Sequence, residues 1–154
     1  MSMRAKQHAH NATVLEQALA DAVSYLYSTR QVSADLAPSI EAHADAMRRV
    51  YSAQGEKSLE MVTLTTDALM NTAPWKLYQA RNGESDLAIP LLEVREILES
   101  ALENPDARYH PGTLHLYIHC TEMSKCPEVA LKANHCLRNL IPRTSLRMRT
   151  KVQG

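Results

Sequence analysis

The chain has 154 residues, with 17 Lys or Arg and 17 Asp or Glu, so its net charge is zero when the histidines are neutral. Its 45% hydrophobic and 22% charged residues are typical of one soluble domain and exclude a disordered or membrane-embedded chain. Zero net charge also argues against nucleic acid as a partner, because phosphate binding relies on an excess of Lys and Arg.

The N-terminus has no apolar stretch after its basic residues, and no apolar run approaches the ~20 residues that span a bilayer. We therefore expect a cytoplasmic protein that does not bind membranes. Cys120, Cys126 and Cys136 are an odd number and lack a CxxC spacing, so we expect reduced thiols rather than a disulfide framework.

Helix is the predicted structure throughout, because four glycines and no phenylalanine disfavour a fold of strands and tight turns. The first helix is predicted over 11–29, where apolar residues from Leu15 to Leu26 recur every three or four positions, with Asn11 or Thr13 as its cap. The second begins near Pro38 and reaches 51, and Gly55 interrupts the chain after it. The third covers 56–71 and must end before Pro74.

The fourth helix is predicted over 88–103, ended by Asn104 and Pro105. The fifth and sixth begin at Pro111 and Pro127 and cover 111–124 and 127–140, with Pro142 after the last one. Residues 1–10 are then a flexible N-terminal tail, 11–142 a single helical domain, and 143–154 a flexible basic C-terminal tail.

Six helices joined mostly by short polar connections predict an all-α fold of antiparallel α-α hairpins. The order of helices fits either a tetratricopeptide-like (TPR-like) superhelix or a compact bundle. The connection 72–87 is long for such a domain, and long loops often carry function. It holds the only tryptophan, Trp75, which either packs as a plug between helix pairs or serves as a platform for binding a ligand.

The fifth predicted helix carries the pattern with the most chemistry, since three of the seven histidines, His110, His115 and His119, fall within ten residues. On a helix, His115, His119 and Glu122 lie within an arc of about 60°, so their side chains share one face. Apolar residues cover nearly every other direction, which predicts a helix inside the stack. The polar side chains are then expected to bond buried partners or to line a groove.

Three interpretations of this His-Glu stripe stay open. The first, which we favour, is a hydrogen-bonded polar seam between helices. The second is a divalent transition metal held by His115, His119 and Glu122, because imidazole and carboxylate suit such ions, with His43, His110 or His135 as a further ligand. The third is a metal-free acid/base or small-molecule site in which His119 and Glu122 act as the catalytic pair. Cys120 projects away from the stripe, so a Cys-His nucleophile is not expected.

Several motifs follow one another in a fixed order: Asp67-Ala68-Leu69-Met70-Asn71, Pro74-Trp75, Asn104-Pro105-Asp106, His110-Pro111-Gly112, His115-x-Tyr117-Ile118-His119-x-x-Glu122 and Pro127-Glu128-x-Ala130-Leu131. Over residues 44–142 this set resembles a widespread family of TPR-like helical repeat proteins. The resemblance implies a superhelix of hairpins with a protein-binding role and no known reaction.

We therefore expect a helical repeat module that binds a protein or peptide partner, with His110, His115, His119, Glu122 and Trp75 as candidate binding residues. Because no repeat follows the sixth helix, its apolar flank is expected to be free for a partner or for a second copy in a homodimer. The alternative is a small enzyme, such as an accessory biosynthetic one, whose stripe does acid/base or metal-assisted chemistry.

Overall fold

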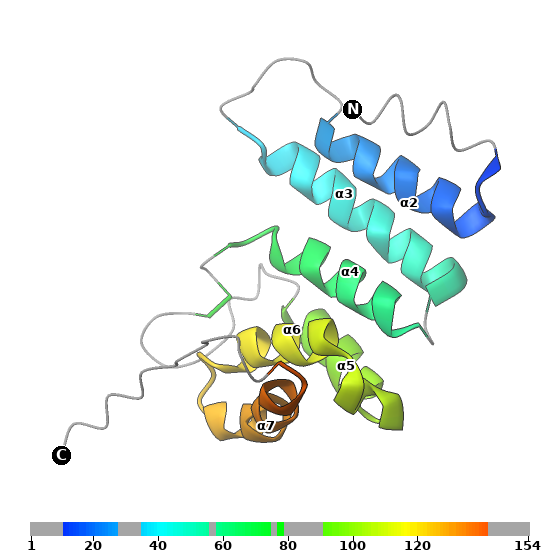
Figure 1. The fold of residues 1–154 in the computed structure, drawn as a ribbon. Coiled ribbons are helices and arrows are strands. Elements are labelled where there is room, and N and C mark those ends of the chain that lie inside the picture. Colours follow the sequence, from blue (N-terminus) through cyan, green and yellow to red (C-terminus); the bar gives the residue numbers. More distant parts are fainter. Residues whose placement is uncertain (1–10, 28–34, 56–57, 75–76, 79–90, 142–154) are drawn as a thin grey trace.

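The computed structural model describes residues 11–27, 35–55, 58–74, 77–78 and 91–141. Within these ranges the chain forms six α-helices and no strand, which confirms the all-α prediction. Figure 1 shows α2, α3 and α4 stacked one after another, with α5, α6 and α7 at the other end of the stack. Both predicted tails and Trp75 lie outside the described residues, and so do parts of the predicted connections and helix ends.

The first hairpin pairs α2 (Val14–Ser24) with α3 (Ala37–Val50). Thr13 caps α2 through a capping box, since its hydroxyl accepts from the Glu16 N–H and the Glu16 carboxylate accepts from the Thr13 N–H. A short 3₁₀ turn, Tyr25–Tyr27, extends α2. Nδ1 of His43 donates to the carbonyl oxygen of Ala22 at 2.9 Å, and this hydrogen bond joins the two helices. His43, a candidate metal ligand in the sequence analysis, therefore has a structural role.

The third and fourth helices are α4 (Leu59–Met70) and α5 (Leu91–Leu102). A π-helical turn, Tyr51–Gly55, continues α3 and ends at the predicted glycine, and Ser58 caps α4 by accepting from the Met61 N–H. Arg48 of α3 forms an ion pair with Glu93 of α5, with a nitrogen–oxygen distance of 2.9 Å. Glu93 raises the pKa of Arg48, as expected for a cation held by a carboxylate.

The last pair is α6 (Pro111–Thr121), which begins at a proline, and α7 (Leu131–Leu140). A 3₁₀ helix, Pro105–Tyr109, precedes α6, and another, Pro127–Ala130, leads into α7. The predicted start of α6 and end of α7 are correct. The prediction of one α-helix from Pro127 is wrong in detail, because its first turn takes the tighter 3₁₀ form.

Helix α6 lies in the middle of the larger core, which includes buried residues of α3, α4, α5, α6 and α7. Seven of its residues are buried: Thr113, Leu114, Leu116, Tyr117, Ile118, Cys120 and Thr121. A second core joins α2, α3 and α4. Successive helices pack on one another, and α6 also packs on α4, so the hairpins form a continuous stack. The predicted interior position of this helix is confirmed.

Helices α4 and α6 run in the same direction, with α5 connecting them. Near the beginning of both helices, the hydroxyl oxygens of Thr63 and Thr113 lie 3.1 Å apart. Further along both helices, the Asp67 carboxylate is close enough to His115 to act on its pKa. Later residues of α4 thus contact later residues of α6, as expected for parallel helices. The exposed side chains of α4 and α6 therefore form neighbouring rows.

No helix among the described residues is both long enough and apolar enough to cross a membrane.

Candidate functional site: the face shared by α4 and α6

The predicted stripe is one chain of side chains along α6. Nδ1 of His119 lies 2.8 Å from Oε1 of Glu122, and Nε2 of His119 lies 3.1 Å from Nε2 of His115. The two imidazole rings meet edge to face, with centroids 4.4 Å apart. Helical spacing alone produces this arrangement, because residues three or four apart share one face.

The Glu122 carboxylate sets the tautomers of both histidines. A carboxylate only accepts hydrogen bonds, so Nδ1 of neutral His119 must carry the proton and donate to Glu122. Nε2 of His119 is then an acceptor, and Nε2 of His115 donates to it. The proton order is therefore defined from His115 through His119 to Glu122.

The stripe lies at the surface. His115 is exposed, and the side chains of His119 and Glu122 are 43% and 35% exposed. The hydrogen-bonded set of the favoured interpretation is therefore present, but it lies on the surface along α6 and its C-cap residue Glu122, and its two hydrogen bonds do not join different helices. The remaining burial still lowers the pKa of His115, and the neighbouring His119 lowers it further, while Glu122 and Asp67 act in the opposite direction.

The predicted three-ligand metal site is not assembled. Glu122 bonds Nδ1 of His119, whereas the nitrogen that faces His115 is Nε2, on the other side of the ring. Among the described residues there is no group of three or more His, Cys, Asp or Glu side chains that could hold an ion. The stripe thus brings its possible ligand atoms together only in pairs, on opposite sides of the His119 ring.

The predicted acid/base pair, His119 and Glu122, is in hydrogen-bond contact, which is the geometry of an imidazole oriented by a carboxylate. Cys120 points away from it, as predicted, and is completely buried. Burial raises the pKa of the Cys120 thiol to about 11, so the thiolate that a nucleophile requires is disfavoured.

His110 has a structural role at the beginning of α6. Its Nδ1 accepts from the backbone N–H of Thr113 at 3.2 Å, so it caps the helix, and its Nε2 lies 3.9 Å from a carboxylate oxygen of Glu60. The hydroxyl of Thr113, completely buried, lies 3.0 Å from the same Nδ1. His110 thus connects the beginnings of α4 and α6, apart from the His115–His119 pair.

Helix α4 adds a row of exposed side chains that the sequence alone did not assign to the site. Glu60, Leu64, Asp67 and Asn71 are all exposed and recur every three or four residues. Asn71 donates to the carboxylate of Asp67 at 3.2 Å, and to the Asp67 carbonyl oxygen, so these two residues bond each other. Helical spacing was the available signal, but spacing within α4 does not show that α4 lies beside α6.

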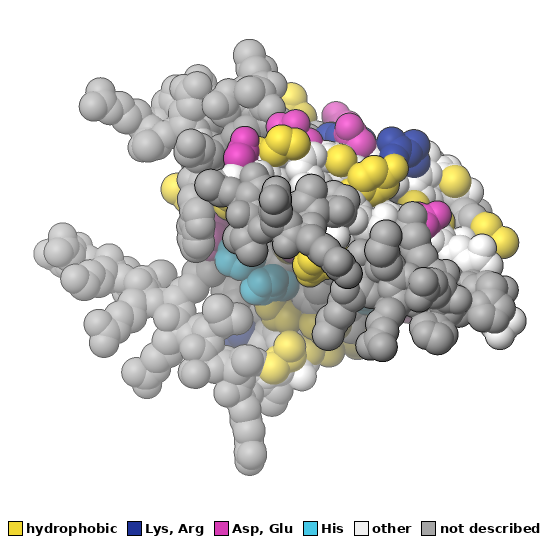
Figure 2. All heavy atoms as spheres, turned by 90° about the horizontal axis from the view of Figure 1, so that it is seen from above, with side chains coloured by type: hydrophobic (Ala, Val, Ile, Leu, Met, Phe, Trp, Pro, Cys, Tyr) yellow, Lys and Arg dark blue, Asp and Glu magenta, His cyan; other side chains and the backbone are white. Residues whose placement is uncertain are grey.

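We call the two rows together the α4–α6 face. It comprises Glu60, Leu64, Asp67, Asn71, His115, His119 and Glu122. Neither α4 nor α6 contains a Lys or Arg residue, and the face carries three carboxylates. Histidine side chains are visible on the surface shown in Figure 2. The chain is neutral as a whole, yet this surface is acidic.

No protein-family model, curated protein or solved structure matches the chain.

Proposed function

We propose that the protein is a TPR-like helical interaction module that binds a basic segment of a partner protein along the α4–α6 face. The observation that carries this proposal is the pairing of two parallel helices whose exposed rows contain three carboxylates, Glu60, Asp67 and Glu122, and no cation. Lys and Arg side chains of a partner would find complementary charge there.

The shape of the face suits an extended segment. Its two rows lie side by side, so a peptide that crosses them meets α4 and α6 together. Leu64, which is 47% exposed, offers an apolar contact between the carboxylates of Glu60 and Asp67. Asn71 and the histidines add hydrogen-bonding groups that can orient a peptide backbone.

His115 makes this binding sensitive to pH. While His115 is neutral, the face is acidic; protonation of His115 adds positive charge beside Asp67 and Glu122 and weakens the attraction for a basic partner. The groups that act on His115 are His119, Glu122 and Asp67. On the opposite side of α6, Arg95 and Glu99 of α5 act on Tyr117 and Cys120. Binding should therefore be stronger at pH 7.5 than at pH 5.5.

Selection from a random peptide library displayed on phage tests the proposal and does not require the natural partner to be identified. The wild-type protein should select peptides rich in Lys and Arg. The double variant D67N/E122Q, which keeps the shape of both side chains and removes two charges, should not select them. Peptides without basic enrichment, or the same peptides selected by both proteins, would contradict the proposal.

Self-association is a separate proposal, supported by α7. Leu131 is 64% exposed and Ile141, directly after the helix, is 39% exposed. Apolar side chains at the two ends of α7 are a surface that a second copy of the chain could cover.

A further inference from the structure

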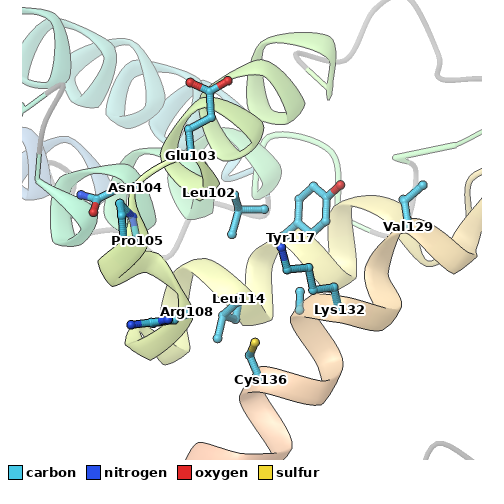
Figure 3. Close-up of a pocket in the computed structure, with 11 residues that line it drawn as sticks. Leu102, Glu103, Asn104, Pro105, Arg108, Leu114, Tyr117, Val129, Lys132 and Cys136 are labelled. Carbon is cyan, nitrogen blue, oxygen red and sulfur yellow. The ribbon is translucent and has the colours of Figure 1, made fainter.

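We propose that a second site, between the end of α5 and α7, binds a small organic anion with an apolar body, such as a medium-chain carboxylate. A pocket of about 470 Å³ lies there, and this volume falls within the range of small-molecule sites. Figure 3 shows its residues arriving from four consecutive parts of the chain: the end of α5, the 3₁₀ helix Pro105–Tyr109, α6, and the segment from Val129 to Cys136.

The base of the pocket is apolar. Leu114 and Ala133 are buried at 2% and 5% exposure, and the ring of Tyr117 is 8% exposed. Leu102 of α5 and Val129 provide further apolar surface. When an alkyl or aryl group enters the pocket, its apolar surface and that of the pocket are both removed from water. This burial is the main source of affinity at such sites.

The rim supplies positive charge. Arg108 and Lys132 both line the pocket, and in the described part of the chain neither forms an ion pair. The guanidinium of Arg108 lies 4.6 Å from the centroid of the Tyr109 ring, which holds it in place without neutralising it. In Figure 3 the amino group of Lys132 extends from α7 toward Tyr117.

One carboxylate, Glu103, also lines the pocket. Figure 3 shows its carboxylate pointing away from Arg108 and Lys132, so it does not neutralise them. The lining therefore combines an apolar base with two cations that form no ion pair with any described residue, and this combination is complementary to an amphipathic anion. The charge preference is opposite to that of the α4–α6 face, so the two sites take different ligands.

Cys136 lies in the same pocket and provides a local reporter. It is half-buried, whereas Cys120 is buried and Cys126 is exposed. In a C126S background, alkylation by iodoacetamide, followed by mass spectrometry of the Cys136 peptide, reports access to the pocket. A bound ligand should shield this thiol.

The probe is decanoate, with decanol as its uncharged counterpart. At a concentration tenfold above its Kd, decanoate should slow alkylation of Cys136 by about tenfold, since about nine tenths of the sites are occupied. K132Q and R108Q should each weaken decanoate binding, measured by calorimetry, by about tenfold, the loss typical of one charged hydrogen bond. Both side chains are exposed, so both variants should fold.

R138Q is the matched control, because Arg138 is an exposed cation of the same helix that does not line the pocket. It should bind decanoate like the parent protein. Equal affinities for decanol and decanoate, equal losses in R138Q and K132Q, or undiminished alkylation of Cys136 in saturating decanoate would each overturn the proposal.

Discussion

Nε2 of His115 and Nε2 of His119 lie 3.1 Å apart, and the carboxylate of Glu122 fixes which of the two carries the proton between them. Neutral histidines satisfy this contact, because one ring donates and the other accepts. If both rings were protonated, two N–H groups and two positive charges would face each other. Burial and the neighbouring His119 accordingly lower the pKa of His115, which favours its neutral form.

The pH dependence of stability follows from the lowered pKa of His115. As the pH falls through about 6.5, the ordinary pKa of histidine, His115 of the unfolded chain takes up a proton before His115 of the folded chain does. The free energy of unfolding should therefore decrease between pH 7.5 and 5.5. Urea denaturation at both pH values should show a smaller decrease in H115Q. A decrease as large in H115Q as in the wild type would contradict this assignment.

Gly112 should resist substitution because α4 approaches it closely. A Cβ atom at this position would lie 2.7 Å from Cγ2 of Thr63. Although alanine favours helix by up to about 1 kcal/mol, overpacking costs about 1–3 kcal/mol, so we expect G112A to lower the free energy of unfolding by about 1 kcal/mol.

A second substitution checks the cause of that loss. T63S removes the obstructing methyl group and keeps the hydroxyl that faces Thr113. G112A should therefore cost less in the T63S background than in the wild type when the four proteins are compared by urea denaturation. An equal cost in both backgrounds would mean that the contact with Thr63 is not responsible.

Thr65 and Thr66 offer a matched pair within α4, since both are completely buried. The hydroxyl of Thr66 donates to the carbonyl oxygen of Val62 at 2.7 Å, whereas that of Thr65 has no hydrogen-bond partner among the described residues. Replacing Thr65 by valine should raise the free energy of unfolding by about 1 kcal/mol, because an unsatisfied buried hydroxyl is removed. T66V should not raise the free energy of unfolding, because it removes a hydroxyl that is hydrogen-bonded. Equal increases in the free energy of unfolding of T65V and T66V would refute the explanation.

Self-association through α7 predicts a dimer in light scattering at a protein concentration of about 100 μM, since weak homodimers form in the micromolar range. L131K places a charge on the exposed apolar end of α7 and should shift the protein to monomer. K132Q changes a neighbouring exposed residue without removing apolar surface and should leave the dimer intact. A wild-type monomer at this concentration would eliminate the proposal.

The sequence predicts the helices and most of their ends well, because these depend on local chemistry. Thr13 as a cap, Pro111 at the first position of α6, and the single face shared by His115, His119 and Glu122 all follow from short-range spacing. The exposure of that face to solvent does not follow from the spacing. The apolar residues of α6 indicate a central helix, but they do not tell which side its neighbours leave open.

The features that the sequence does not predict depend on packing between segments far apart in the chain. Asp67 joins the site because α4 runs parallel to α6, and no pattern within either segment encodes that pairing. Arg108 and Lys132 likewise meet at one pocket only because α7 packs against the 3₁₀ helix before α6. The proposed roles of Trp75 and the two tails stay predictions, since these residues lie outside the described ranges.

The affinity of a basic peptide for charge-neutralised variants tests the central claim most directly. The probe is the tightest Lys- or Arg-rich peptide from the phage selection, labelled with fluorescein and measured by anisotropy. D67N/E122Q removes two carboxylates of the α4–α6 face, whereas E41Q/E128Q removes two exposed carboxylates elsewhere and changes the net charge equally. We predict a loss of about tenfold or more in D67N/E122Q and less than about twofold in E41Q/E128Q. Equal affinities of the two double variants would contradict binding at this face.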